Sequence, residues 1–124
     1  MEKIVIDSHA LFWFLTENQK LSKKAKQAIE DADQVIVPSI VLMEVLFILE
    51  KYNVAHQFLD VLQELQSKRY IVFPLDVTVA VRVFTLGHSL EMHDRIIVAI
   101  ARMHTAPIVT KYSMIHKNYP LIIW

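Results

Sequence analysis

Three acidic side chains, Asp7, Glu44 and Asp94, stand where they could do chemistry. Glu44 is the one acid in the apolar run IVLMEVLFIL at 40–49, where a buried carboxylate must be protonated, paired or bound to a cation. Asp7 follows the β-branched run KIVI, and Asp94 directly precedes RIIVAIA. Carboxylates that converge repel one another unless a cation lies between them, and carboxylate ligands alone favour Mg²⁺ or Mn²⁺ over zinc. The three acids therefore predict a divalent-cation site.

Each acid also has a purely structural interpretation. Asp7 is typical of a helix N-cap, and Asp94 is typical of a first-turn acid that complements the helix dipole. Taken alone, these are the more usual roles. Glu44 could pair in the core with an arginine such as Arg82 or Arg95. We favour the cation hypothesis because it accounts for all three acids together.

Other catalytic chemistries find little support in the sequence. There is no cysteine, and the chain has a single glycine, Gly87, so thiolate sites and glycine-rich phosphate loops are excluded. No GxSxG motif is present. The segment HSLEMHDR places His88 and His93 near Asp94, so that either could orient a substrate or a carboxylate. A polar loop residue is the more usual role for each.

Strand and helix patterns alternate along the chain and predict an α/β fold. Short apolar runs bounded by turn residues predict strands at 3–6, 34–38, 69–74, 107–110 and 120–124. Helical spacing predicts helices at 9–15, 21–32, 40–52, 53–68, 77–87 and 93–105, with N-caps at Ser22, Ser39, Asn53 and Asp76. Strands that alternate with helices form parallel sheets, whose sites lie at the carboxyl ends of the strands. The three acids flank such transitions.

Composition limits the protein class. We expect the 124 residues to form one domain, 1–124. The 13 basic and 13 acidic residues balance, and we interpret Lys20, Lys23, Lys24 and Lys26 as a solvated helix face rather than a phosphate track. No run is long enough for a membrane span, and MEKIVID has no signal-peptide pattern, so we expect a cytoplasmic protein without a membrane partner. The 54% hydrophobic content suggests burial against a partner chain.

Three segments together resemble one known family. IVIDSHALFWFL, VIVPSIVLMEVLFILEK and HDRIIVAIARMHTAPIVTKYSMI are similar in order and separation to the PIN-domain family, in particular to VapC-type toxin ribonucleases of type II toxin–antitoxin systems. The closing YPLIIW is similar to the last strand of that subgroup. The resemblance implies a three-layer α/β/α sandwich with a central, mostly parallel five-stranded sheet. It also implies an Mg²⁺- or Mn²⁺-dependent endoribonuclease that hydrolyses RNA with a metal-activated water, a cognate antitoxin and a homodimer.

The resemblance also assigns roles to individual residues. Asp7, Glu44 and Asp94 match the first three catalytic acids of the family, with Asp7 and Asp94 as direct metal ligands. Three accessory positions match as well: Ser8 after the first acid, Arg95 after the third, and Thr110 two residues before the fourth. For partner contacts, the candidates are the aromatic residues Phe12, Trp13, Phe47 and Tyr52, although core packing is the more usual role of the first three.

At the fourth acid the sequence departs from the family pattern. Where the family has Thr, any residue and Asp, this chain has Thr110, Lys111 and Tyr112. A neutral phenol is a poor ligand for a hard cation, so we expect one weakly bound metal. Glu91 would restore the number of carboxylates to four only if its turn brings its side chain into the site. The alternative is a PIN-fold protein with weak or no nuclease activity that acts by binding RNA or protein.

Overall fold

A computed structural model describes residues 2–124 and contains a five-stranded, wholly parallel sheet. The strands run in the spatial order β3-β2-β1-β4-β5, so that the chain starts in the middle of the sheet and fills both sides. Their bounds are β1 Lys3–Ile6, β2 Gln34–Pro38, β3 Tyr70–Phe73, β4 Ile108–Val109 and β5 Ile122–Ile123. All five predicted strands are present, although β3, β4 and β5 are shorter than predicted.

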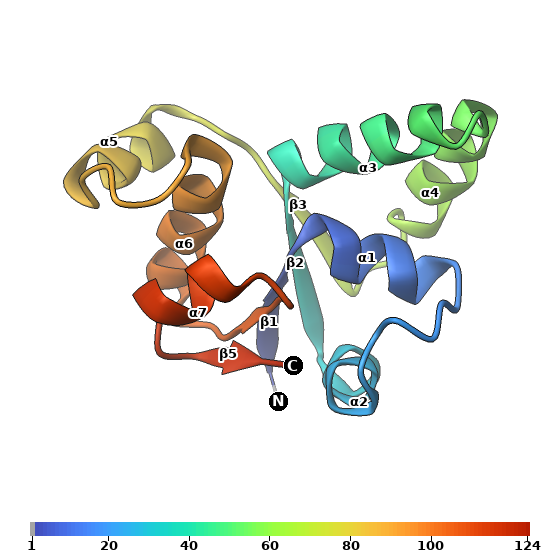
Figure 1. Cartoon of the computed structure of the whole chain (residues 1–124), viewed down its shortest axis with the longest axis horizontal. Coiled ribbons are helices and arrows are strands. Elements are labelled where there is room, and N and C mark those ends of the chain that lie inside the picture. Colours follow the sequence, from blue (N-terminus) through green and yellow to red (C-terminus); the bar gives the residue numbers. More distant parts are fainter. Residues whose placement is uncertain (1) are drawn as a thin grey trace.

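Helices cover both faces of this sheet, which confirms the three-layer α/β/α sandwich (Figure 1). The first group comprises α1 Ser8–Leu15, α2 Lys23–Asp31, α3 Ser39–Lys51 and α4 Phe58–Glu64, with the short 3₁₀-helix η1 at Ala55–Gln57. The second group, on the other side in Figure 1, comprises α5 Val77–Thr85, α6 Met92–His104 and α7 Ser113–Asn118. Among residues 2–124, no helix is both long and apolar enough to cross a membrane.

The inner strands β1, β2 and β4 are buried on both faces and consist mostly of Val and Ile. Ile4, Val5 and Ile6 of β1 have no exposed surface, and the same is true of both residues of β4. Such continuous apolar strands are typical of parallel sheets covered by helices. The strand register aligns Ile6 of β1 with Val109 of β4. The residues that follow, Asp7 and Thr110, therefore leave the sheet side by side.

Two of the four predicted helix caps are confirmed. The Ser22 hydroxyl accepts a hydrogen bond from the Ala25 amide, and the Asp76 carboxylate accepts one from the Val79 amide. The other two predictions were wrong. Ser39 is already helical, and its hydroxyl accepts from the amide of Leu75 on the neighbouring segment. Asn53 has φ +60°, and the expected helix 53–68 is broken into η1 and α4.

The burial expected for the apolar run at 40–49 is only partly present. Five residues of α3 are buried: Val41, Leu42, Val45, Ile48 and Leu49. The opposite face is open to solvent, with Phe47 67% exposed and Met43 also exposed. Glu44 lies between these two faces, and its side chain is 29% exposed. Glu44 is therefore only partly buried, so the condition that it be protonated, paired or bound to a cation applies to it in part.

Candidate active site

The three predicted acids line one cavity of about 480 Å³ at the carboxyl edge of the sheet. Asp7 follows β1, Glu44 lies in the second turn of α3, and Asp94 lies in the first turn of α6. The parallel topology brings them together, because β1 and β2 both end at this edge and α3 begins directly after β2. The other lining residues are Ser8, His9, Ala10, Trp13, His93, Lys111, Tyr112 and Ser113.

Asp7 caps α1 and is also held by the neighbouring strand. Its Oδ1 accepts a 2.7 Å hydrogen bond from the Ser8 amide, which confirms the capping role. Its Oδ2 accepts a 2.6 Å bond from the Thr110 hydroxyl, which in turn accepts from the Tyr112 amide at 3.0 Å. Thr110 is fully buried. The carboxylate is thereby fixed at the cavity wall, with lone pairs left on both oxygens.

Asp94 is the most deeply buried of the three acids. Its side chain is 3% exposed, and its Oδ2 has no hydrogen-bond partner within residues 2–124. Burial raises the pKa of Asp94 to about 6, while the charge of His93 opposes the rise and that of Asp7 adds to it. A buried carboxylate oxygen without a partner is costly and is typical of a site that a ligand completes.

Glu44 meets the same cluster from α3. Its Oε2 lies 3.7 Å from Nε2 of His93, and its buried Oε1 has no hydrogen-bond partner in the described chain. Burial raises the pKa of Glu44, the charges of Asp7 and Asp94 add to the rise, and His93 lowers it. Among residues 2–124, no arginine forms an ion pair with Glu44. The alternative of a core pair with Arg82 or Arg95 was therefore wrong.

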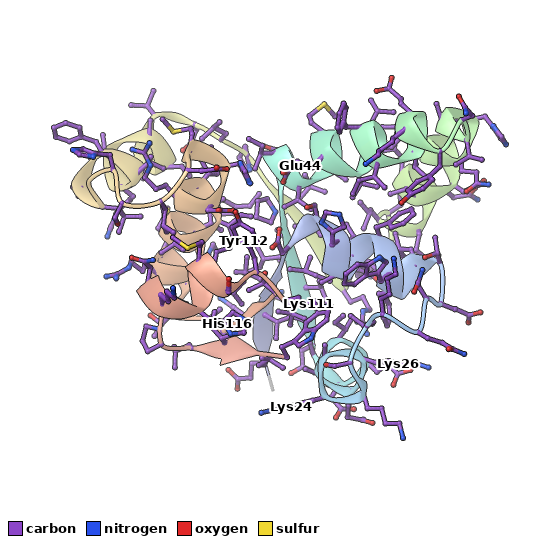
Figure 2. The ribbon with its side chains drawn as sticks, in the orientation of Figure 1. Lys24, Lys26, Glu44, Lys111, Tyr112 and His116 are labelled. Atoms are coloured by element: carbon purple, nitrogen blue, oxygen red, sulfur yellow. The ribbon has the colours of Figure 1, made fainter. Side chains whose placement is uncertain are left out.

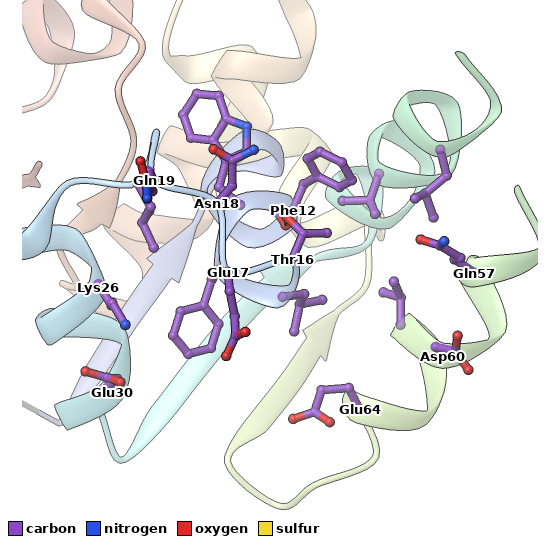
Figure 3. Close-up of a pocket in the computed structure, with 17 residues that line it drawn as sticks. Phe12, Thr16, Glu17, Asn18, Gln19, Lys26, Glu30, Gln57, Asp60 and Glu64 are labelled. Carbon is purple, nitrogen blue, oxygen red and sulfur yellow. Dashed lines mark hydrogen bonds between the residues drawn. The ribbon is translucent and has the colours of Figure 1, made fainter. Parts of the chain in front are cut away.

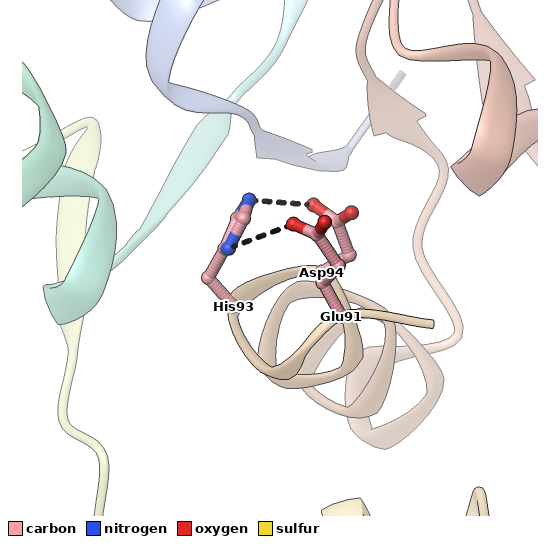
Figure 4. Close-up of side chains that lie close together, drawn as sticks. All are labelled: Glu91, His93 and Asp94. Carbon is pink, nitrogen blue, oxygen red and sulfur yellow. Dashed lines mark ion pairs between the residues drawn. The ribbon is translucent and has the colours of Figure 1, made fainter. Parts of the chain in front are cut away.

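His93 lies at the centre of the charged groups. Its Nε2 is 3.1 Å from Oδ1 of Asp94, and its Nδ1 is 3.9 Å from Oε2 of Glu91 (Figure 4). Ligand atoms of Glu91, His93 and Asp94 all lie within 4.8 Å of one another. The sequence pointed only to a histidine that could orient a carboxylate. The contact between His93 and Glu44 joins two helices that are far apart in the sequence, so no local sequence pattern predicts it.

These residues fit a divalent cation. Asp94 and Glu44 each carry a buried oxygen without a partner, and the carboxylates of Glu44, Glu91 and Asp94 all lie within 4 Å of the His93 imidazole. Oxygen ligands suit Mg²⁺ and Mn²⁺, and a nearby cation would relieve the repulsion that helps to raise both pKa values. Asp7 and Asp94 would hold such an ion, with Glu44 beside them.

Where the resemblance predicts a fourth acid, the cavity is lined by a phenol, that of Tyr112. Tyr112 lines the cavity and is partly exposed, close to Lys111 in Figure 2. The charges of Asp94 and Glu91 raise the pKa of Tyr112 above its ordinary value, so the phenol remains neutral. His116, on α7, lies 2.8 Å from the Thr110 carbonyl through Nε2 and supports this turn. We had not predicted α7.

The accessory residues fall in different places. Ser8 is buried beside Asp7, and the Thr110 hydroxyl donates a hydrogen bond directly to Asp7. Glu91 reaches the cluster through Nδ1 of His93, but its side chain is 70% exposed. Arg95 is not brought to the cavity. It donates to the Gly87 carbonyl at 3.0 Å and lines a separate apolar cavity between α5 and α6.

A second cavity, of about 650 Å³, lies between α1, α3 and α4 and has a different character (Figure 3). Its charged lining residues are Glu17, Lys26, Glu30, Asp60 and Glu64. Among residues 2–124, no three ligand atoms gather closely there, unlike at His93. Lys24 and Lys26 lie on α2, away from Glu44 (Figure 2). The predicted solvated helix face is confirmed for Lys23, Lys24 and Lys26, which are exposed on α2, whereas Lys20 precedes the helix.

Comparisons with known proteins agree with the fold described above. The family model for the PIN domain matches residues 4–117. Ribonuclease VapC22 of Mycobacterium tuberculosis (strain ATCC 25618 / H37Rv) is 31% identical over 131 aligned residues, covering 100% of both chains. A toxin–antitoxin complex from Klebsiella pneumoniae is 22% identical, with a TM-score of 0.73 over 98% of this chain and 96% of that one. DNA-bound VapBC from Salmonella typhimurium is 20% identical, with a TM-score of 0.71 over 98% and 96%.

Proposed function

This chain belongs to the PIN domain family, as the match over residues 4–117 shows, and we propose that it is a divalent-metal-dependent endoribonuclease, the toxin of a toxin–antitoxin pair. A relative with 31% identity over its whole length is named a ribonuclease, which supports the reaction. The observation that carries the proposal is a single cavity lined by Asp7, Glu44 and Asp94, in which two buried carboxylate oxygens lack partners.

Asp7 and Asp94 are the proposed metal ligands, and Glu44 completes the catalytic set. Thr110 keeps Asp7 in place through its 2.6 Å hydrogen bond, and Ser8 supports the same carboxylate. Mg²⁺ or Mn²⁺ bound there would lower the pKa of a water and stabilise negative charge on the phosphate. Glu44, with its raised pKa, is placed to hold or accept a proton at Oε1.

The rim of the cavity offers contacts for a nucleic acid. Lys111 lines the cavity, and its ammonium nitrogen lies 5.9 Å from the centre of the Trp13 ring. Lys20 approaches the same ring at 6.0 Å. Trp13 is partly buried, so it presents a fixed aromatic face beside two cations. Phosphates attract lysines and bases stack on aromatic rings, so this rim supports RNA as the substrate.

RNA cleavage in the presence of Mg²⁺ or Mn²⁺ tests the proposal. We expect the wild type and the control variant Asp60→Asn, which lies outside the site, to cleave RNA. Asp7→Asn and Asp94→Asn should be inactive, because each loses a carboxylate that the cation needs. Equal cleavage by the wild type and both site variants would remove the nuclease proposal.

Protein partners belong to the same proposal. An antitoxin and a homodimer would cover exposed apolar side chains, which a monomer in water leaves unfavourably open. Phe47 and Tyr52 are such positions, whereas Phe12 and Trp13 pack against the core. A second set lies on and around α5: Leu75, Val77, Val81, Phe84 and Met92. We propose a cytoplasmic location, where RNA is available. Sedimentation at micromolar concentration tests the homodimer, and a monomer would contradict it.

A second candidate function rests on Tyr112. Because this position carries a neutral phenol, the chain could bind RNA or protein with little cleavage. Calorimetric titration with Mn²⁺ distinguishes the two candidates. Absent or millimolar binding in the wild type, with tighter binding in Tyr112→Asp, would favour the second.

A further inference from the structure

The acid cavity contains a group that the proposed nuclease site does not use, the imidazole of His93. It projects from the first turn of α6 between carboxylates that come from two elements, Glu44 of α3 and Asp94 of α6. Its side chain is only partly exposed. A histidine in a loop would satisfy its nitrogens with water, whereas this one has a carboxylate near each nitrogen.

Two carboxylate oxygens lie near Nε2, and the nearer one, from Asp94, is at the spacing of adjacent ligands of one ion. Oδ1 of Asp94 lies at 3.1 Å from Nε2 and Oε2 of Glu44 at 3.7 Å. In an octahedral site with bonds of about 2.1 Å, adjacent ligand atoms are about 3 Å apart and opposite ones about 4.2 Å. Oδ2 of Asp94, on a side chain that is almost wholly buried, has no partner in the described chain and is a second, independent sign of a missing ligand.

The opposite ring nitrogen has the surroundings expected of a metal-bound histidine. Nδ1 faces Oε2 of Glu91 at 3.9 Å (Figure 4). Histidines that bind metals usually give their second N–H to a carboxylate or carbonyl, which orients the ring and leaves the other nitrogen free to bind. Glu91 is mostly exposed, so it can close this short gap by rotating its side chain.

We propose that His93 replaces the missing fourth carboxylate as a direct ligand through Nε2, with Glu91 orienting its ring, so that the site prefers Mn²⁺ to Mg²⁺. The inference rests on the proposed function, because it requires a cation between Asp7 and Asp94. An imidazole nitrogen is a better ligand for a transition ion than for Mg²⁺, which prefers oxygen. A site with Tyr112 at the fourth position and His93 as a ligand would therefore select between Mn²⁺ and Mg²⁺ differently from a site with four carboxylates.

Pulsed electron paramagnetic resonance of Mn²⁺ added to the full-length protein tests this directly, because a bound imidazole couples its ¹⁴N nucleus to the metal electrons. We expect ¹⁴N modulation in the wild type and in His9→Gln, and none in His93→Gln. His9 is the matched control, since it lines the same cavity but packs at a tilt against Trp13 and forms no ion pair with the acids. His93→Gln should weaken Mn²⁺ binding by about tenfold or more but change Mg²⁺ binding by less than about threefold. Glu91→Gln should weaken Mn²⁺ binding by about tenfold.

The outcomes separate this inference from the nuclease proposal. Mn²⁺ that binds the wild type without ¹⁴N modulation would overturn the ligand role of His93 and leave the acid site standing. Tighter binding of both cations by His93→Gln would also overturn it, because His93 would then act only as a competing positive charge. No Mn²⁺ binding by the wild type would overturn both. The wild-type spectrum decides even if His93→Gln fails to fold.

Discussion

Helices α3 and α6 each span 13 residues and each supply one acid to the same cavity, yet they bury those acids to different depths. Glu44 lies in the more apolar of the two helices and is 29% exposed. Asp94 lies among the charged and polar residues that open α6 and is 3% exposed. Helix α6 packs seven buried residues into the molecule, Asp94 among them, while α3 leaves one apolar face open.

The difference shows that apolar neighbours in sequence do not measure burial. Helix α3 packs with one face only, and the side chains on its outer face, such as Phe47, remain open for a partner. Helix α6 is enclosed, so its acid loses most of its hydration. Asp94 is therefore the acid that most needs a cation, and Glu44 is the more adaptable one.

Exchanging each acid for its amide gives the largest contrast. We expect Asp94→Asn to lower Mn²⁺ affinity and RNA cleavage by about 100-fold or more, because water cannot replace a buried ligand. Glu44→Gln should lower cleavage by about tenfold, since solvent reaches its position. Calorimetry and single-turnover cleavage measure the two effects. An equal or greater loss of cleavage in Glu44→Gln would contradict the expectation that the more deeply buried acid contributes more.

Core truncations compare the helices by stability. Ile97 on α6 has no exposed surface, and Ile97→Ala should lower the free energy of unfolding by about 2–5 kcal/mol. Phe47→Ala on α3 should change it by less than about 0.5 kcal/mol, because the ring is mostly in solvent. Chemical denaturation of the monomer checks both values. A large cost for Phe47→Ala at low protein concentration would mean that α3 packs against something within the chain.

The pH dependence of stability reports the burial of Asp94. Its pKa is about 6 in the folded chain, against an ordinary value of 3.8, so folding favours the protonated acid. Without metal, the stability due to this group is present below pH 3.8 and is lost as the pH rises toward about 6. Asp94→Asn should therefore have the higher free energy of unfolding at pH 7, by about 1–2 kcal/mol after allowance for screening, with a correspondingly higher Tm, and should match the wild type near pH 4. A metal-free Tm difference that does not vary with pH would contradict this.

The smallest expected effect concerns Tyr112. Tyr112→Asp should tighten Mn²⁺ binding by about three- to tenfold, because it adds a carboxylate at the partly exposed rim. Tyr112→Phe keeps the ring and should leave affinity within about twofold. Calorimetric titration of the two variants provides the comparison. A loss of affinity in Tyr112→Asp would show that this position faces away from the cation.

Much of the fold was predictable, because continuous Val and Ile runs specify buried parallel strands. Elements held by few residues were not: α7 has only six residues, and Asn53 adopts a positive φ that interrupts a pattern with regular helical spacing. At the site, the topology explains why Asp7 and Thr110 meet although 103 positions separate them. The contact between His93 and Glu44 depends on how α3 and α6 pack, which no local pattern encodes.

The proposed function depends on one cation that Asp7 and Asp94 bind together, with Glu44 beside it. A crystal of the full chain soaked in Mn²⁺ and measured at an anomalous wavelength tests it most directly. We predict one strong anomalous peak in the cavity, within about 2.5 Å of a carboxylate oxygen of both Asp7 and Asp94. The absence of a peak at millimolar Mn²⁺, or a peak that one acid alone contacts, would contradict the claim.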